Sequence, residues 1–328
     1  MPELIEEQLE TPSDALFSVV AGEGDGSLLG MAAGDTAGGA WELGYSATTE
    51  QATLIAYELI THRSIDGDGL VSALLEMDGA SGESPVFRAE SGELRMWLDR
   101  AAAGKPVPGE EPSLDAAPRA AMVGVAYRKD GDAVIHEAVA LNRLFHSDAG
   151  TVASGVIAAA ALAASCFAQS GLDLIAGVAE AVTPSLDRLG PGLVGEGRLK
   201  SIPVEIDRLS PLVGMTEGEQ ALTAVGGQRD DPVQMTLAGL LLGAPVAPRH
   251  HQPIEQAARI GGSRLGAFVG AMVGARVGLR AWPWIFANDT WFAEIGRRLV
   301  RGPDEVRDLP IPYAVEHHIM SGSNPGFH

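Results

Sequence analysis

The chain contains one cysteine, few aromatic residues and far fewer basic than acidic residues. Cys166 is the only cysteine among 328 residues, so it cannot form an intrachain disulfide, and we expect a reducing compartment. Its alanine-rich surroundings indicate a small buried hydrophobic residue rather than a catalytic thiol. The first ten residues, MPELIEEQLE, lack the cationic and apolar regions of a signal peptide. Together these features predict a cytoplasmic protein.

Basic residues and long hydrophobic runs are both scarce. The chain has 23 Lys and Arg against 43 Asp and Glu, a formal net charge of -20, which repels phosphate backbones and argues against nucleic acid as a partner. A net charge of -20 is still compatible with a local basic pocket for one small anion. Residues 151–168 are uncharged over nearly the length of a membrane span. Their alanine, serine and glycine content predicts a buried helix instead, so we expect no membrane partner.

Strand signals are almost absent, because alternation of β-branched residues never persists for five positions. Helical spacing of apolar residues is frequent. It predicts helices over 27–40, 49–62, 68–77, 91–102, 116–127, 132–143, 149–169, 173–186, 216–225, 231–242, 253–278 with a break near Gly261, and 289–300. With 46% hydrophobic residues and no linker-like stretch, the sequence predicts a single all-α globule.

Glycine recurs at every fourth position in two segments. The first series is Gly22, Gly26, Gly30, Gly34 and Gly38, and the second is Gly262, Gly266, Gly270, Gly274 and Gly278. A glycine inside a helix costs about 1 kcal/mol relative to alanine, so two such series need a compensating gain. Residues four apart share one helix face, and small residues there let helix backbones approach closely. We therefore expect both helices at the centre of the fold.

Four segments combine polar residues with an expected helix start, namely 34–42, 45–54, 115–124 and 260–270. Backbone N–H groups at a helix start attract anions. Two of the segments, Ser46 to Thr49 and Gly261 to Arg264, place both hydroxyl groups and backbone amides at an expected helix start. This combination indicates a pocket for phosphate.

The same four segments resemble, in order, the motifs of the ADP-ribosylglycohydrolase family, which includes the enzymes that remove ADP-ribose from dinitrogenase reductase. The matching stretches are GMAAGDTAGGAWE with the family's GxAxGDAxGxxxE pattern, YSATTEQATL with its TDDTQM-type helix start, DAAPRAAMVG and the following LFHSDAG with its SNGAAMR and TH segments, and IGGSRLGAFVGAMVGARVG with its GGDxDTxxAxxGAxxGAxxG stretch. The resemblance implies a compact multi-helix fold over residues 25–301, with an acidic N-terminal arm at 1–24 and a C-terminal tail at 302–328.

This sequence departs from the family pattern at the metal-binding positions. The resemblance implies metal ions held by the aspartates of the TDDT and GGDxDT motifs. Here Ala47, Thr48, Ser263 and Leu265 replace those aspartates, and Gly266 replaces a threonine. A divalent cation loses most of its electrostatic binding without carboxylates, and water activation then loses its metal assistance. We therefore expect no metal-binding residues and no Mg or Mn cofactor.

Several polar positions of the family pattern are retained. Asp35 and Glu42 match acidic positions of the first motif and are the candidate catalytic residues, although Asp35 is equally suited to capping a helix. The candidate ligand-binding residues are Ser46, Thr48, Thr49, Arg119, His146, Gly262, Ser263 and Arg264. Arg264 lies between the two lost aspartate positions, where a guanidinium can bind a pyrophosphate or a carboxylate such as Glu42. The alternatives are a surface arginine at 264 and a core histidine at 146.

Three functions are compatible with these residues. The preferred one is a catalytically inactive protein that binds an ADP-ribose-like or other phosphorylated ligand, or a protein partner. The second is a hydrolase of ADP-ribosyl or related N- or O-glycosidic bonds, in which Asp35 and Glu42 act as metal-independent acid and base. The third is a structural subunit, in which the glycine series and the aromatic residues of 282–292 matter more than the pocket. Core packing is the default for these aromatic residues, and a partner surface is the alternative. An oligomer is compatible with each function.

Overall fold

The computed structural model describes residues 24–39, 44–79, 87–88, 90–189, 192–215, 217–245, 249–279, 282–284, 286–301, 309–310, 312 and 315. The α-helices in these ranges are α1 (Ser27–Gly38), α2 (Ala47–His62), α3 (Gly67–Gly79), α4 (Gly92–Ala102), α5 (Ala116–Ala126), α6 (Gly131–Phe145), α7 (Ala149–Ser165), α8 (Gly171–Val182), α9 (Leu186–Leu189), α10 (Ile202–Asp207), α11 (Glu219–Ala224), α12 (Pro232–Gly243), α13 (Gln252–Val277) and α14 (Asp289–Arg301). Within the described ranges strand pairing is limited to two isolated bridges, Gly109 with His146 and Asp148 with Val194. The prediction of an all-α fold is confirmed.

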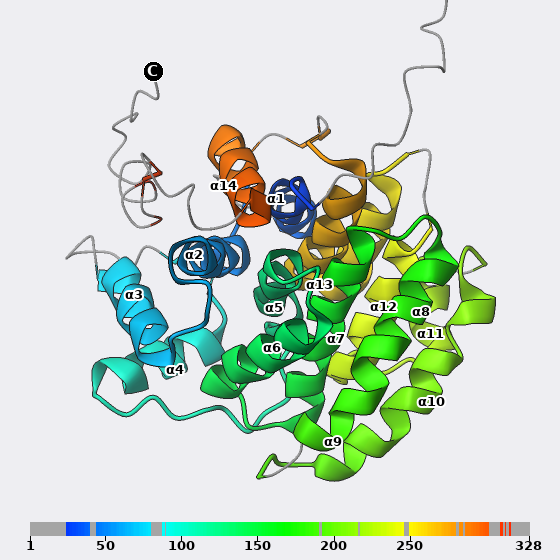
Figure 1. The fold of residues 1–328 in the computed structure, drawn as a ribbon, viewed down its shortest axis with the longest axis horizontal. Helices are drawn as coiled ribbons and strands as arrows, with labels where there is room; N and C mark the ends of the chain where they lie inside the picture. The colour runs from blue at the N-terminus through cyan, green and yellow to red at the C-terminus, as the bar shows by residue number, and fades with distance from the viewer. Residues whose placement is uncertain are drawn as a thin grey trace, which may run out of the picture.

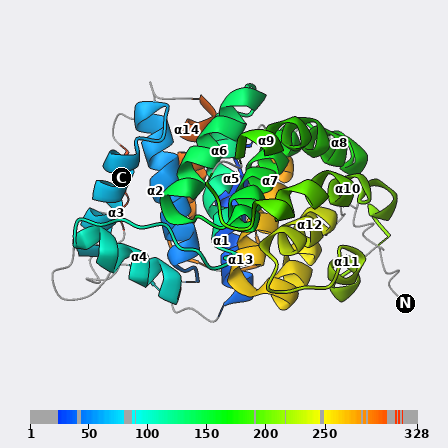
Figure 2. The same cartoon turned by 90° about the horizontal axis from the view of Figure 1, so that it is seen from below.

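Helices α1 and α13 lie together in the middle of the molecule, with α3 and α4 on one side and α8, α10 and α11 on the other (Figures 1 and 2). Their glycines face each other in antiparallel order. A Cβ atom added at Gly30 would overlap the carbonyl oxygen of Gly270, and one added at Gly34 would overlap that of Gly266. The converse substitutions meet the same obstacle. The predicted close helix packing at the centre of the fold is confirmed from Gly26 onward, and the structure shows that the two glycine series pack against each other. Gly22 lies outside the described residues.

The break expected near Gly261 is present as a kink in α13. Gly261 has φ -125° and ψ 17°, and Gly262 has φ 65° and ψ -154°. Residues other than glycine rarely adopt the backbone conformation of Gly262. A new helical segment therefore begins at Ser263, and its backbone lies against Gly38 at the end of α1.

The predicted buried helix at 149–169 corresponds to α7, whose residues are nearly all shielded from solvent. No helix in the described part of the chain is long and apolar enough to cross a membrane. Cys166 is buried as expected and its thiol donates to the carbonyl of Leu162. The sequence prediction omitted the short helical segments η3 (Glu196–Ser201), α10 and η4 (Ser210–Leu212).

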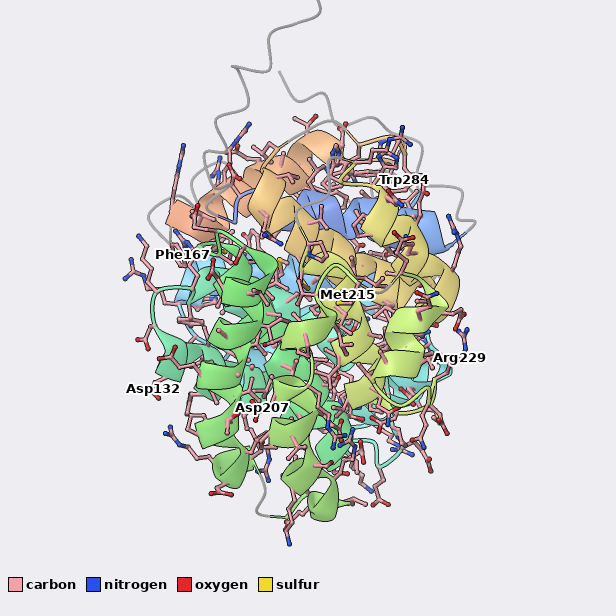
Figure 3. The ribbon with its side chains drawn as sticks, turned by 90° about the vertical axis from the view of Figure 1, so that its right-hand side faces the viewer. Asp132, Phe167, Asp207, Met215, Arg229 and Trp284 are labelled. Carbon is pink, nitrogen blue, oxygen red and sulfur yellow. The ribbon has the colours of Figure 1, made fainter. Side chains whose placement is uncertain are left out.

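The C-terminal aromatic residues belong mainly to the core. Phe286, Trp291 and Phe292 are buried, while Trp284 lies at the periphery (Figure 3). On the same view Phe167 and Met215, the latter 76% exposed, lie apart from each other. Single exposed apolar side chains of this kind are normal for a protein surface.

Candidate functional site

The Asp35 carboxylate of α1 binds the N-terminus of α2. It accepts the backbone N–H of Ser46 at 2.8 Å and that of Thr49 at 3.2 Å. The Ser46 and Thr49 hydroxyls also donate to it, at 2.8 and 2.7 Å. Burial raises the pKa of Asp35, and these hydrogen bonds oppose the shift. Asp35, Ser46 and Thr49 therefore hold α1 and α2 together, which is the capping role left open by the sequence.

The next turn of α2 is fixed by an ion pair that sequence reasoning missed. The fully buried Glu50 carboxylate contacts the Arg88 guanidinium at 2.5 Å and accepts the Arg88 backbone N–H at 2.9 Å. The Arg88 carbonyl in turn accepts the N–H of Ala47 at 2.7 Å. Thr48 is half-buried and donates its N–H to the Ser46 hydroxyl. Glu42, the second candidate catalytic residue, lies outside the described residues.

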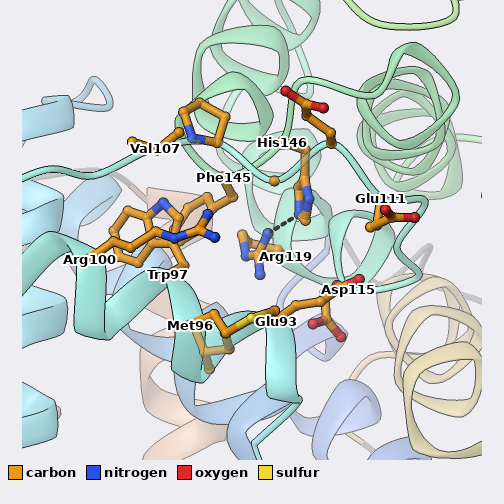
Figure 4. Close-up of a pocket in the computed structure, with 14 residues that line it drawn as sticks. Glu93, Met96, Trp97, Arg100, Val107, Glu111, Asp115, Arg119, Phe145 and His146 are labelled. Atoms are coloured by element: carbon orange, nitrogen blue, oxygen red, sulfur yellow. Dashed lines mark hydrogen bonds between the residues drawn. The ribbon is translucent and has the colours of Figure 1, made fainter.

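A cavity of about 430 Å³ lies between α4, the segment 107–115, the start of α5 and the end of α6 (Figure 4). Trp97 and Phe145, with ring centroids 4.5 Å apart, form part of its apolar wall. The polar side chains that line it are Glu93, Arg100, Glu110, Glu111, Asp115, Arg119 and His146. Two of the predicted ligand-binding residues, Arg119 and His146, are thus brought together in one cavity.

Arg119 is held on three sides and is 3% exposed. Its Nη1 lies 2.8 Å from Nε2 of His146. Its Nε and Nη2 both donate to Oε1 of Gln51, at 3.2 and 3.1 Å. Its guanidinium carbon lies 3.9 Å from the centroid of the Phe145 ring. Burial lowers the pKa of Arg119 to about 10, with Asp115 and Glu93 acting in the opposite direction. The guanidinium therefore keeps its positive charge at neutral pH.

His146 is neutral in this environment, because burial and the adjacent Arg119 lower its pKa to about 3. A guanidinium can only donate, so Nε2 of His146 is the acceptor of the shared hydrogen bond. The proton of the neutral ring is then assigned to Nδ1. His146 thus has one donor left for a further hydrogen bond.

Arg264 pairs with a carboxylate that the sequence did not single out. Its Nε donates to Oδ1 of Asp115, and the Ser91 hydroxyl donates to Oδ2 at 2.7 Å. Burial disfavours the charged form of Asp115, but Arg264 and Arg119 outweigh burial and hold its pKa below the ordinary value. Glu93 shows the opposite behaviour, since burial and the nearby Asp115 raise its pKa. The pair Arg264–Asp115 therefore joins the kink of α13 to the start of α5.

The residues at the family's metal positions do not fit a divalent cation. Leu265 is 5% exposed, and its apolar side chain lies against Gly239 and Gly261. Ala47 provides no ligand atom from its side chain, and the carboxylate of Asp35 is already engaged by Ser46 and Thr49. Among the residues described, no three His, Cys, Asp or Glu side chains are grouped so that they could hold a metal ion.

Comparison with known proteins agrees with the all-helical fold. The family model described as ADP-ribosylglycohydrolase matches residues 24–308. The chain belongs to the ADP-ribosylglycohydrolase family. A solved structure described as an ADP-ribosylglycohydrolase-related protein complex is similar at 18% identity with a TM-score of 0.62, covering 85% of this chain and 97% of that one. At this identity the similarity shows the fold alone. No curated protein matches the chain.

Proposed function

We propose that this protein is a catalytically inactive, metal-free member of its family that binds an ADP-ribose-like or other phosphorylated small molecule in the cavity beside Arg119. The observation that carries the proposal is the ion pair of Arg264 with Asp115. Arg264 lies between the two positions where the family pattern has metal-binding aspartates. A guanidinium supplies a fixed positive charge, but it has no open coordination position at which water could be activated.

The chemistry of the cavity supports a ligand with phosphate and ring groups. Arg119 and His146 are buried side chains of its lining, and the exposed Arg100 adds a second cation. Trp97 and Phe145 offer apolar contact area for a ring. A volume of about 430 Å³ lies within the range of small-molecule sites. Glu110 and Glu111 are exposed, so solvent and salt screen their repulsion of an anion.

Titration calorimetry with ADP-ribose tests this proposal. We expect binding in the presence of EDTA, with an affinity that Mg²⁺ does not change. Removing one charge-assisted hydrogen bond costs about 1.5–3 kcal/mol, so Arg119→Ala and Arg100→Ala should each weaken binding by at least about tenfold. Arg208→Ala, which removes an exposed arginine elsewhere, is the matched control. Binding that requires Mg²⁺, or that survives both cavity substitutions, would contradict the proposal.

One observation favours a second candidate function, a metal-independent hydrolase of N- or O-glycosidic bonds. Glu93 and Asp115 line the same cavity, and their pKa values move in opposite directions. A general acid and a general base in one site require pKa values that lie apart. In this second candidate function the acid and base are Glu93 and Asp115 instead of Asp35, which is buried between α1 and α2. Release of ADP-ribose in EDTA that disappears in Glu93→Gln would favour the hydrolase over the binding protein.

A further inference from the structure

A second cavity, of about 340 Å³, lies at the opposite ends of α5 and α6 from the Arg119 cavity. It is bordered by the last turn of α2, the segment that joins α5 to α6, and the last turn of α14. These helices pack against one another (Figure 1). Four cationic residues line this basic cavity, namely Arg63, Arg128, Lys129 and Arg301.

The basic cavity has little negative charge of its own. Asp130 is the one acidic residue among the described residues that line it, and its Oδ1 already accepts the N–H of Ala133 at 3.0 Å. The carboxylate of Glu137, from the same helix, accepts the N–H of Ile65. Within the described ranges, none of the four cations forms an ion pair with a carboxylate. On a chain with a net charge of -20, four cations without an ion pair to a described carboxylate thus line one cavity.

The C-terminal ends of three helices balance part of the positive charge of the basic cavity. The C-termini of α2, α5 and α14 meet here, and each carries about half a negative charge. Arg128 satisfies two of these ends, because it donates to the carbonyls of Val125 at 3.3 Å and Val300 at 3.1 Å. The side chains of Arg63, Lys129 and Arg301 make no hydrogen bond with any other residue that the structure describes. Among the described residues of the basic cavity, positive charge therefore exceeds the negative charge of the helix ends and Asp130.

We propose that the basic cavity binds the phosphate or pyrophosphate group of a small free molecule, independently of the Arg119 cavity. Arginine presents a planar set of donors that matches phosphate oxygens, and lysine adds a compact point charge. The volume is that of a small-molecule site rather than of a groove for a polymer. The acidic remainder of the surface also disfavours nucleic acid. This site does not rest on the function proposed for the Arg119 cavity.

Calorimetry on the full chain with inorganic pyrophosphate tests the inference. We expect saturable one-site binding that weakens as NaCl is raised to about 0.3 M, because exposed charges are screened. The double charge reversal Lys129→Glu with Arg301→Glu should weaken it by at least about tenfold. Lys200→Glu with Arg208→Glu makes the same change in net charge on an exposed surface near α10, far from α14 (Figure 1), and should leave affinity within about twofold.

Three results would overturn the inference. They are the absence of saturable binding by the wild-type chain, an equal loss in both double variants, and a loss in Arg119→Ala that places pyrophosphate in the other cavity. Thermal melting of each variant checks that the fold is retained. Pyrophosphate binding that persists in Arg119→Ala while ADP-ribose binding is lost would support both sites separately, so the failure of one proposal can be told from the failure of the other.

Discussion

Alanine at position 270 tests whether the α1–α13 contact depends on the absence of a side chain. A Cβ atom there would overlap the carbonyl oxygen of Gly30 and lie 3.2 Å from Cα of Gly34. Both obstacles are backbone atoms, which cannot rotate away as a side chain can. Overpacking in a core costs about 1–3 kcal/mol or more, whereas the higher helix propensity of alanine returns about 1 kcal/mol. Because both obstacles are rigid, we expect the cost to lie at the upper end of that range and the net loss in the free energy of unfolding to be about 2 kcal/mol, measured by urea denaturation.

Gly131→Ala is the matched control for this substitution. Gly131 begins α6, and a Cβ atom there has no neighbour within 4 Å. The same chemical change should therefore leave stability unchanged or raise it by up to about 1 kcal/mol. If Gly270→Ala matches the wild type or Gly131→Ala in urea midpoint, the glycines do not serve the approach of the two backbones.

Two further predictions concern the Arg119 cavity. Because the folded pKa of His146 is about 3, below the ordinary 6.5, its neutral form contributes stability that is fully present above pH 6.5 and is lost as pH falls toward 3. NMR should show no titration of its ring between about pH 5 and 8, and His146→Gln should flatten the acid side of the stability profile. Arg264→Leu leaves the buried Asp115 carboxylate without its ion-pair partner. We expect it to lower the free energy of unfolding by about 1–3 kcal/mol, a range that already allows for the partial exposure of Arg264 to solvent. Asp115→Asn combined with Arg264→Leu should recover part of that loss, and a double-mutant cycle that gives purely additive changes would rule out the coupling.

Local patterns were sufficient to predict most of the fold. Apolar spacing located α7 and α13 to within a few residues, because long periodic helices are marked by many positions at once. The glycine series predicted close packing of two central helices, because glycine at every fourth position of a helix is costly unless another backbone packs closely against that face. That the two series face each other is visible only in the structure. The short helices between Glu196 and Leu212 were missed because six or fewer residues give too few positions for a period, and α10 and η4 also have a proline at their start.

The site was less predictable because it depends on pairs of residues far apart in the chain. Arg119 and His146 were named from the family pattern, and the structure places them 2.8 Å apart. Asp115 also lies in the motif that contains Arg119, but nothing local marked it as the partner of Arg264, which is 149 positions away. Glu93 carried no signal at all, since its raised pKa arises only when α4 packs beside the start of α5.

At the positions that match the metal motifs of the family pattern, the elements are joined by contacts within the chain. Gly266 stands where that pattern has a threonine, and a Cβ atom there would overlap the carbonyl oxygen of Gly34, so this close contact between α1 and α13 requires glycine. Asp35 ties α1 to α2 through four backbone and hydroxyl donors of Ser46 and Thr49. Arg264 ties α13 to α5 through Asp115. Contacts within the chain therefore join α1, α2, α5 and α13 at the positions of the family's motifs.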